Sequence, residues 1–151
     1  MIRKELKIPG IREGTVIDHI PSDKTFKAVE ILDLASTRDI ISVATNLQSK
    51  KLGTKGIIKI GGKYLSKEEA DKIALIAPRA TVNIIKSYEV KRKIKLAVPD
   101  VIDKIIKCAN PKCITNNEKV ETRFYTIKDK EAKFMCHYCE RCISLEGLEL
   151  L

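Results

Sequence analysis

Thr15-Val16-Ile17-Asp18-His19-Ile20, followed at once by Pro21-Ser22-Asp23, is the stretch from which the fold of the first part of the chain is read. The first six residues are rich in β-branched side chains, which favours a strand. The next three offer a turn and a helix cap. An apolar stripe at helical spacing follows, formed by Phe26, Val29 and Leu32. We therefore expect a strand followed by a helix.

The same alternation continues to residue 96. Residues 40–47 and 55–60 are expected to form two strands separated by a loop. Ser66 and Glu69 have the spacing of a capping box, which predicts a helix that runs to Ile76 and stops before Pro78. Two last strands are expected in residues 81–87 and 88–96. The order βαββαβ, with one additional strand, predicts an α+β fold: a ferredoxin-like antiparallel sheet with two helices on one face.

A domain boundary is expected near Ala97, because composition changes there and a proline follows the last predicted strand. The chain of 151 residues then divides into residues 1–97 and residues 98–151. All five cysteines lie in the second part. A segment of about 40–60 residues usually needs stabilisation by disulfides or a bound metal, since its hydrophobic core is small.

Four of these cysteines have the spacing of a metal site. Cys108 and Cys113 form one knuckle, and Cys136 and Cys139 form a second. Paired thiolates on tight turns converge on a tetrahedron, so we expect one structural Zn²⁺ in a small zinc-ribbon-like β domain. Cys142 or His137 is an alternative ligand in the second knuckle. An iron–sulfur cluster would also use four thiolates, but neither common ferredoxin spacing is present.

Charge is concentrated in the first part of the chain. Residues 1–97 contain 20 basic and 11 acidic residues, whereas residues 98–151 contain nine of each. The excess predicts an anionic ligand, namely nucleic acid, a membrane surface or a nucleotide phosphate, although a lysine-rich solvated surface is an equally simple interpretation. No apolar run approaches the roughly 20 residues that cross a bilayer, and no signal-peptide core is seen, so we expect a cytoplasmic protein that does not bind membranes.

The candidate ligand residues of the first part are polar and basic. Asp18 and His19 are consecutive, so their side chains are expected on opposite faces of a strand and not as a dyad. Lys55 and Lys59 would share one face near the basic residues 91–93, an arrangement that suits phosphates. No nucleophile with a partnered base can be assembled, and the strands lack the aromatic residues of an RNA-binding sheet. We therefore expect neither catalysis nor nucleic-acid binding.

Three motifs together resemble a known family. The stretches 14–20 and 75–83 and the four-cysteine pattern, taken in order and spacing, are similar to the regulatory chain of aspartate carbamoyltransferase. The resemblance implies that residues 1–97 form a nucleotide-effector-binding allosteric domain. It also implies that residues 98–151 dock on the catalytic chain and that two regulatory chains form a homodimer. The implied effectors are CTP, ATP and UTP-type nucleotides.

The resemblance also implies roles for single residues. Asp18 would contact the ribose or base, Lys59 would bind both, and His19, Lys55 and Lys93 would lie near the phosphates. The rest of the effector pocket would be completed by Ile11, Val16, Asn83, Ile85, Tyr88 and Val90. Asn110 and Glu140 match positions that contact the catalytic chain, whereas Lys112 and Pro9 depart from the pattern.

The leading hypothesis is therefore a non-catalytic regulatory subunit in pyrimidine biosynthesis. A free-standing zinc-ribbon protein that binds nucleic acid is the alternative, because the front domain is positive and the knuckles alone fit many proteins. A small phosphate-handling enzyme of the acylphosphatase kind would have the right sheet but lacks an identified arginine loop.

Overall fold

The computed structural model describes residues 10–151, so Pro9 and the departure expected there lie outside the described residues. The chain divides after Ala97 into two compact units. Each unit has its own sheet and its own buried side chains.

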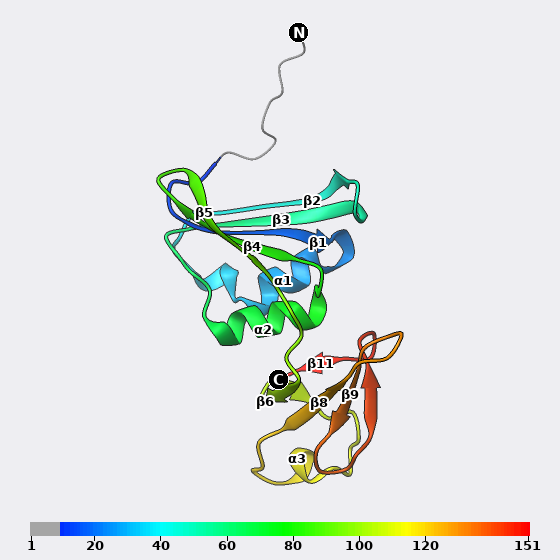
Figure 1. The fold of residues 1–151 in the computed structure, drawn as a ribbon. Helices are drawn as coiled ribbons and strands as arrows, with labels where there is room; N and C mark the ends of the chain where they lie inside the picture. The colour runs from blue at the N-terminus through cyan, green and yellow to red at the C-terminus, as the bar shows by residue number, and fades with distance from the viewer. Residues whose placement is uncertain (1–9) are drawn as a thin grey trace. The chain divides into compact units, whose positions relative to one another are not determined.

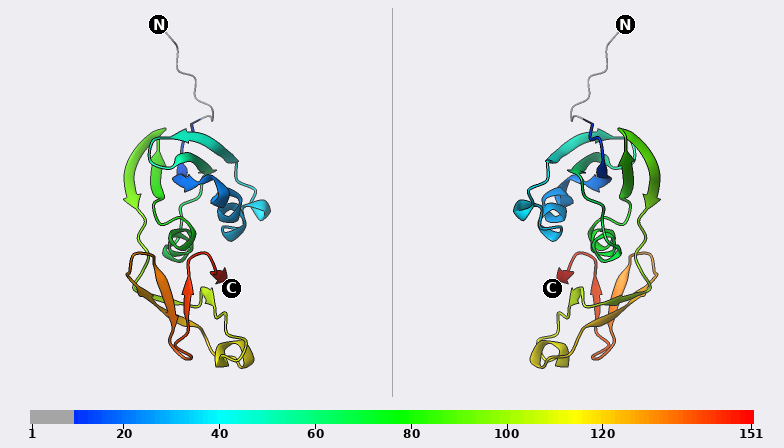
Figure 2. Two further views of the ribbon diagram at one scale, coloured as in Figure 1. Left: turned by 90° about the vertical axis from the view of Figure 1, so that its right-hand side faces the viewer. Right: turned by 90° about the vertical axis from the view of Figure 1, so that its left-hand side faces the viewer.

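The first unit is a five-stranded antiparallel sheet in the order β2-β3-β1-β4-β5. Two helices, α1 and α2, cover one face of this sheet (Figures 1 and 2). The α+β prediction is confirmed, with the additional strand at one edge. The elements are β1 (Gly14–Pro21), η1 (Ser22–Lys24), α1 (Thr25–Ile31), η2 (Leu34–Ser36), β2 (Ile41–Ser49), β3 (Gly53–Gly61), α2 (Lys67–Ile76), β4 (Thr81–Lys86) and β5 (Glu89–Lys95).

Strand β1 is the centre of the sheet and pairs with β3 and β4. Its buried residues Thr15, Ile17 and Ile20 belong to the core, together with Ile58 and Ile60 from β3. Residues between them, such as Val16, are only partly buried. One face of the sheet is thus sealed by the helices while the other remains accessible.

The apolar stripe predicted for the first helix is confirmed at Leu32 and wrong at Phe26, while Val29 is half-buried. Phe26 is 67% exposed, whereas Thr25, Ala28 and Leu32 are buried. The reason is a close approach at the start of α1: a Cβ on Gly56 would lie 1.9 Å from the Thr25 hydroxyl. Because glycine leaves room for it, the threonine side chain faces the sheet and turns Phe26 outward.

The second helix begins as predicted. The Ser66 side chain accepts from the Glu69 backbone N–H at 3.2 Å, and the Glu69 carboxylate accepts from the Ser66 N–H at 3.1 Å. This capping box satisfies donors that the first turn leaves without partners. The helix ends at Ile76, two residues before Pro78.

The expected alternation of Asp18 and His19 is wrong, because β1 carries a bulge there. The ladder to β3 shifts register between Ile17 and Ile20, and His19 has a φ of 60°. The His19 ring nitrogen Nδ1 lies 3.2 Å from the hydroxyl of Thr81, which is the β4 partner of Asp18. The bulge therefore brings the imidazole beside the Asp18–Thr81 pair.

The second unit is a small β domain, as predicted. Its main sheet has the order β10-β9-β8-β6, and β11 pairs with β7. Phe124, Phe134 and Ile143 are buried from the sheet, and Ile102 and Ile106 complete a modest core. The elements are β6 (Val101–Asp103), β7 (Ile106–Lys107), α3 (Ile114–Asn117), β8 (Arg123–Ile127), β9 (Lys133–Cys136), β10 (Cys142–Ser144) and β11 (Glu149–Leu150).

Within residues 10–151, we find no helix with the length and apolar character needed to span a membrane.

Candidate metal centre and ligand cavity

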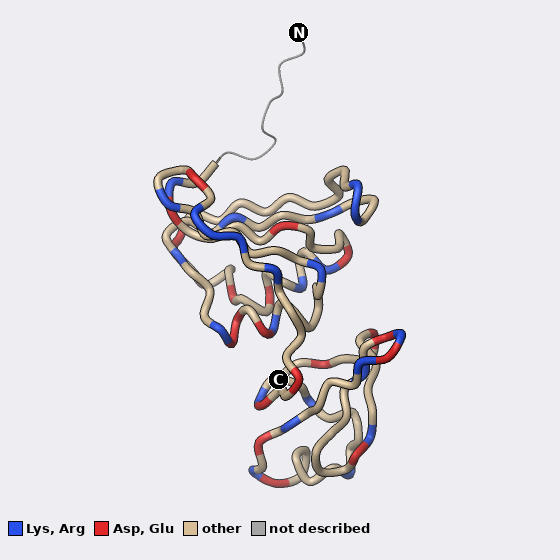
Figure 3. Tube along the Cα trace, in the orientation of Figure 1, with Lys and Arg blue, Asp and Glu red and all other residues tan. Residues whose placement is uncertain are grey.

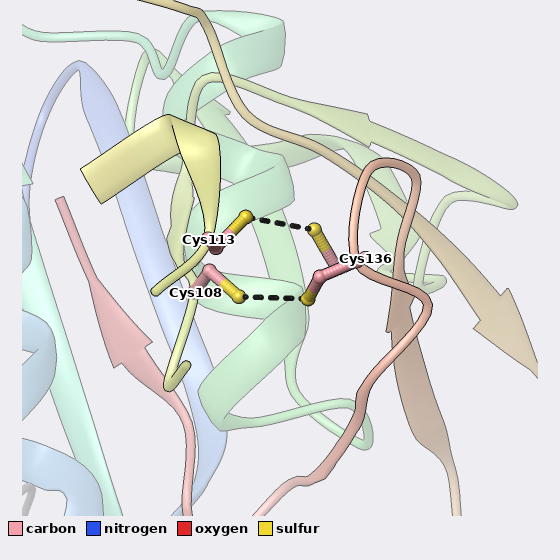
Figure 4. Close-up of side chains that lie close together, drawn as sticks. Cys108, Cys113 and Cys136 are labelled. Carbon is pink, nitrogen blue, oxygen red and sulfur yellow. Dashed lines mark hydrogen bonds between the residues drawn. The ribbon is translucent and has the colours of Figure 1, made fainter. Parts of the chain in front are cut away.

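Four cysteine side chains of the second unit converge on one point. Cys108 follows β7, Cys113 precedes α3, Cys136 ends β9, and Cys139 lies in the turn before β10. Their sulfur atoms all lie within 4.8 Å of one another. Figure 4 shows the side chains of Cys108, Cys113 and Cys136 directed toward each other across the cluster.

The spacing of the sulfur atoms fits a tetrahedral metal. Cys108 Sγ lies 3.6 Å from Cys139 Sγ, and Cys113 Sγ lies 3.7 Å from Cys136 Sγ. A tetrahedron with zinc–sulfur arms of about 2.3 Å has edges of about 3.8 Å. The distances are far longer than the roughly 2.05 Å of a disulfide. The cluster thus fits one structural zinc ion.

Backbone and amide hydrogen bonds shape both knuckles. In the first, the Cys113 N–H donates to the Asn110 carbonyl at 3.0 Å. The Asn116 side-chain amide donates to the carbonyls of Cys108 at 2.9 Å and Asn110 at 2.8 Å. In the second, the Glu140 N–H donates to the Cys136 carbonyl at 2.9 Å. These contacts fix the turns that carry the ligands.

Burial disfavours the thiolate forms of the clustered cysteines. Burial raises the pKa of the Cys108 thiol to about 12 and also raises the pKa of Cys136. Burial opposes ionisation of Cys139 as well, but hydrogen bonds from the Arg141 backbone and the Asn110 side chain outweigh it and lower that pKa to about 7. A bound zinc ion would supply the positive charge that stabilises the thiolates.

The two alternative ligands lie outside this cluster. Cys142 is exposed and pairs with Met135 in the β9–β10 ladder. The Nδ1 atom of His137 is engaged by the Tyr125 hydroxyl at 2.7 Å. Among the described residues, the group that could hold a metal is therefore the first pairing that the sequence predicted.

A cavity of about 280 Å³ lies on the first unit, over residues of the sheet face that the helices do not cover. A row of directly paired residues crosses this face: Lys59, Val16, Asn83 and Lys93 come from β3, β1, β4 and β5 in turn. Eight of the predicted effector residues line the cavity, together with Gly10 and Ile57. These eight are Ile11, Val16, Asp18, Lys59, Asn83, Ile85, Tyr88 and Val90.

Two lining residues were missed from the sequence. Ile57 lies between Lys55 and Lys59 on β3, and period-two alternation places all three on one face, so this signal was available. Gly10 comes from the segment before β1. A backbone hydrogen bond joins this segment to the β4–β5 turn: the Tyr88 N–H donates to the Arg12 carbonyl at 2.9 Å. That contact depends on the three-dimensional fold and leaves no local pattern.

The other three predicted residues surround the cavity without lining it. Lys93 stands at the end of the row, opposite Asn83. Lys55 forms an ion pair with Asp18, with its Nζ 2.9 Å from Oδ1. Burial lowers the pKa of His19; Asp18 opposes this, and the nearby cations of Lys55, Lys51 and Lys93 lower it further. The surroundings of the cavity are therefore positive.

The two predicted contact residues lie at the cysteine knuckles. Asn110 is half-buried, and its side-chain oxygen accepts from the Lys112 N–H at 3.1 Å. Glu140 is exposed and has a φ of 60°, which belongs to the tight turn after Cys139. Ile114 and Tyr138 are exposed beside them, at 42% and 45%.

Fold and site together define a two-domain chain: a basic sheet domain with a ligand-sized cavity, joined to a small domain built around a four-cysteine metal centre. Residues 6–97 match the model for the allosteric domain of the aspartate carbamoyltransferase regulatory chain, and residues 100–149 match the model for its metal-binding domain. The chain belongs to this family of regulatory, non-catalytic subunits. The alternative of a free-standing zinc-ribbon protein is not favoured by these matches.

Individual relatives agree over nearly the whole length. An aspartate carbamoyltransferase regulatory chain from Pyrococcus horikoshii is 55% identical over 146 residues, which cover 95% of this chain and 96% of the relative. One from Thermococcus sibiricus is 57% identical over 138 residues, 91% of each chain. One from Phocaeicola vulgatus is 44% identical over 149 residues, which cover 99% of this chain and 96% of the relative.

Proposed function

We propose that the cavity on the first unit binds the base and ribose of a nucleoside triphosphate effector of the CTP, ATP or UTP type. The observation that carries this proposal is the meeting of eight residues, distant in sequence, around one cavity on the accessible sheet face. At about 280 Å³ the cavity is near the lower limit of ligand pockets, which suits a nucleoside rather than a whole triphosphate. The phosphates would extend beyond it toward Lys93.

The chemistry of the walls supports this orientation. Val16, Ile57 and Ile85 offer apolar contact for a flat base. The Asn83 amide and the Asp18 carboxylate offer hydrogen-bonding groups for sugar and base edges. The positive surroundings of His19 favour a polyanion, since lysines bind phosphates as point charges.

Calorimetric titration of the full chain with CTP, ATP and UTP tests this assignment. We expect Lys59→Ala and Lys93→Ala to weaken binding about tenfold each, because each removes a charge-assisted contact. Lys67→Ala is the matched control, since Lys67 lies on α2, is 87% exposed and belongs to the helix that covers the opposite face. Unchanged affinity in both cavity variants would refute the assignment.

We further propose that the chain forms a homodimer through strand β2. The two edges of the sheet differ sharply: β5 carries five charged residues in seven, and Figure 3 shows its lysines and arginine along one edge. Strand β2 has no charged residue in nine, and Ile40, Val43 and Phe26 are exposed on or near it. Charged side chains protect an edge strand from pairing, whereas an uncharged edge invites it.

The second unit is proposed to dock on the aspartate carbamoyltransferase catalytic chain through its cysteine knuckles. Asn110 and Glu140 would supply polar contacts, and the exposed Ile114 and Tyr138 would supply apolar ones. Effector binding would then bias a two-state assembly through contacts that differ between the states.

We place the assembly in the cytoplasm, because a reducing compartment keeps free cysteines available for zinc.

A further inference from the structure

Lys55 is a basic residue beside the cavity whose ammonium group is already engaged. Its Nζ lies 2.9 Å from Asp18 Oδ1 and 3.2 Å from Oδ2, so it contacts both carboxylate oxygens. The two side chains are only 18% and 20% exposed. Asp18 lines the cavity and Lys55 does not.

The bulge in β1 adds a second contact to the same carboxylate. Because the backbone of His19 adopts a φ of 60°, its N–H points back and donates to Asp18 Oδ1 at 2.6 Å. The carboxylate is thus held by a charge from β3 and by a backbone donor of its own strand. Such charge-assisted contacts fix the position of an acceptor at a ligand-binding surface.

We propose that Lys55 is a positioning residue: it holds the Asp18 carboxylate at the cavity wall for the nucleoside part of the effector, and it is not a phosphate ligand. This inference rests on the proposed nucleotide function. It gives Lys55 a different role from the phosphate contact that the family resemblance implies for that position.

Two physical arguments favour the positioning role. Moving the ammonium group to a phosphate would break an ion pair in a mostly buried setting, where a carboxylate left without its partner is costly. It would also leave the negative charge of Asp18 uncompensated close to a polyanion, and like charges repel. Lys93, which is exposed at the edge of the sheet, reaches phosphates without either cost.

A phosphate series separates the two roles. Dissociation constants are measured by calorimetry for the mono-, di- and triphosphate of one nucleoside, with the wild-type chain and with Lys55→Met. If Lys55 acts through Asp18, we expect a loss of about tenfold that is the same within about twofold for all three ligands. A loss that grows with each added phosphate would overturn the proposal, as would no loss for any of the three.

Further variants test the route through Asp18. In an Asp18→Asn background, the Lys55→Met substitution is expected to cost less than about twofold, since the group that Lys55 positions is gone. Lys55→Arg is expected to recover part of the loss for every ligand in the series. Lys93→Met is the matched comparison, and its loss is expected to grow with phosphate number. A tenfold loss from Lys55→Met that persists without the Asp18 carboxylate would contradict the inference.

The folded state is checked by thermal unfolding of each variant. If Lys55→Met does not fold, Lys55→Gln takes its place, because the glutamine amide can still donate a neutral hydrogen bond to Asp18. We then expect a smaller loss of affinity that is again equal for the mono-, di- and triphosphate. A wild-type chain that binds none of the nucleotides would instead refute the proposed function itself, so the two failures are distinguishable.

Discussion

Replacing Cys136 with serine is the most informative perturbation of the second unit. Cys136 is fully buried, and its sulfur lies 3.7 Å from that of Cys113. The substitution removes one of the four thiolates around the proposed zinc ion. We expect residues 98–151 to unfold while the first unit keeps its fold, because each unit has its own sheet and buried side chains.

The size of the effect follows from the small core of this unit. Residues 98–151 form a domain whose hydrophobic core alone rarely supplies more than about 3–5 kcal/mol at this length. Structural zinc contributes about 10–16 kcal/mol of apparent folding free energy near pH 7. The folding free energy lost with the metal is therefore larger than the stabilisation that Phe124, Phe134 and their few apolar neighbours supply.

The assay combines metal analysis with NMR spectra of the full chain. In Cys136→Ser we expect less than one zinc per chain, loss of dispersion for the rings of Phe124 and Phe134, and unchanged signals for Ile17 and Ile58. Cys142→Ser is the matched control, since Cys142 lies outside the cluster and should leave zinc content and spectra unchanged. Dispersed Phe124 and Phe134 signals in zinc-free Cys136→Ser would show that the second unit folds without its metal, contrary to this prediction.

Three further predictions concern the first unit. Gly56→Ala should lower the free energy of unfolding by about 2 kcal/mol in denaturant titrations, because its Cβ would meet the buried Thr25; an unchanged value would contradict the close packing at that point. The pKa of Glu69 is below its usual value, since hydrogen bonds from Lys63 and Ser66 outweigh the opposing effect of burial. The stabilisation of the folded state by ionised Glu69 is therefore complete above the unfolded pKa of about 4.3 and is lost as pH falls through the lower folded pKa. Glu69→Gln should lower the free energy of unfolding by about 1 kcal/mol at pH 7 and by close to nothing at pH 2. A cost that does not change with pH would argue against the ionised contact. Val43→Lys should shift the chain from dimer to monomer in sedimentation experiments, and a dimer that survives it would argue against pairing through β2.

Local patterns predicted the elements whose causes are local. The capping box at Ser66 and Glu69 fixes the start of α2 through contacts three residues apart, so its spacing alone was sufficient. The cysteine knuckles are also local, and the first of the pairings that their spacing allowed is the one that converges in the structure. The order of strands and helices along the chain followed from the alternation of short β-branched runs with helical segments.

The features that escaped prediction depend on contacts between distant segments. The outward turn of Phe26 results from the fit of Thr25 against Gly56, which lies on a different strand. The bulge at His19 interrupts a regular alternation, and nothing in six consecutive β-branched and polar residues indicates it. The ion pair of Lys55 with Asp18 joins side chains of two different strands, β3 and β1, so the face assigned to Lys55 from period-two spacing did not reveal it.

We propose that this chain senses nucleotides and transmits their binding to a catalytic chain. The most direct measurement is the aspartate carbamoyltransferase activity of the purified catalytic chain, reconstituted with the wild-type regulatory chain or with Lys93→Ala, over a range of nucleoside triphosphate concentrations. We predict that at least one nucleotide changes the activity of the wild-type assembly, and that Lys93→Ala requires about tenfold more of it for the same change. An assembly that forms but has the same activity with and without every nucleotide would rule out nucleotide sensing by this chain.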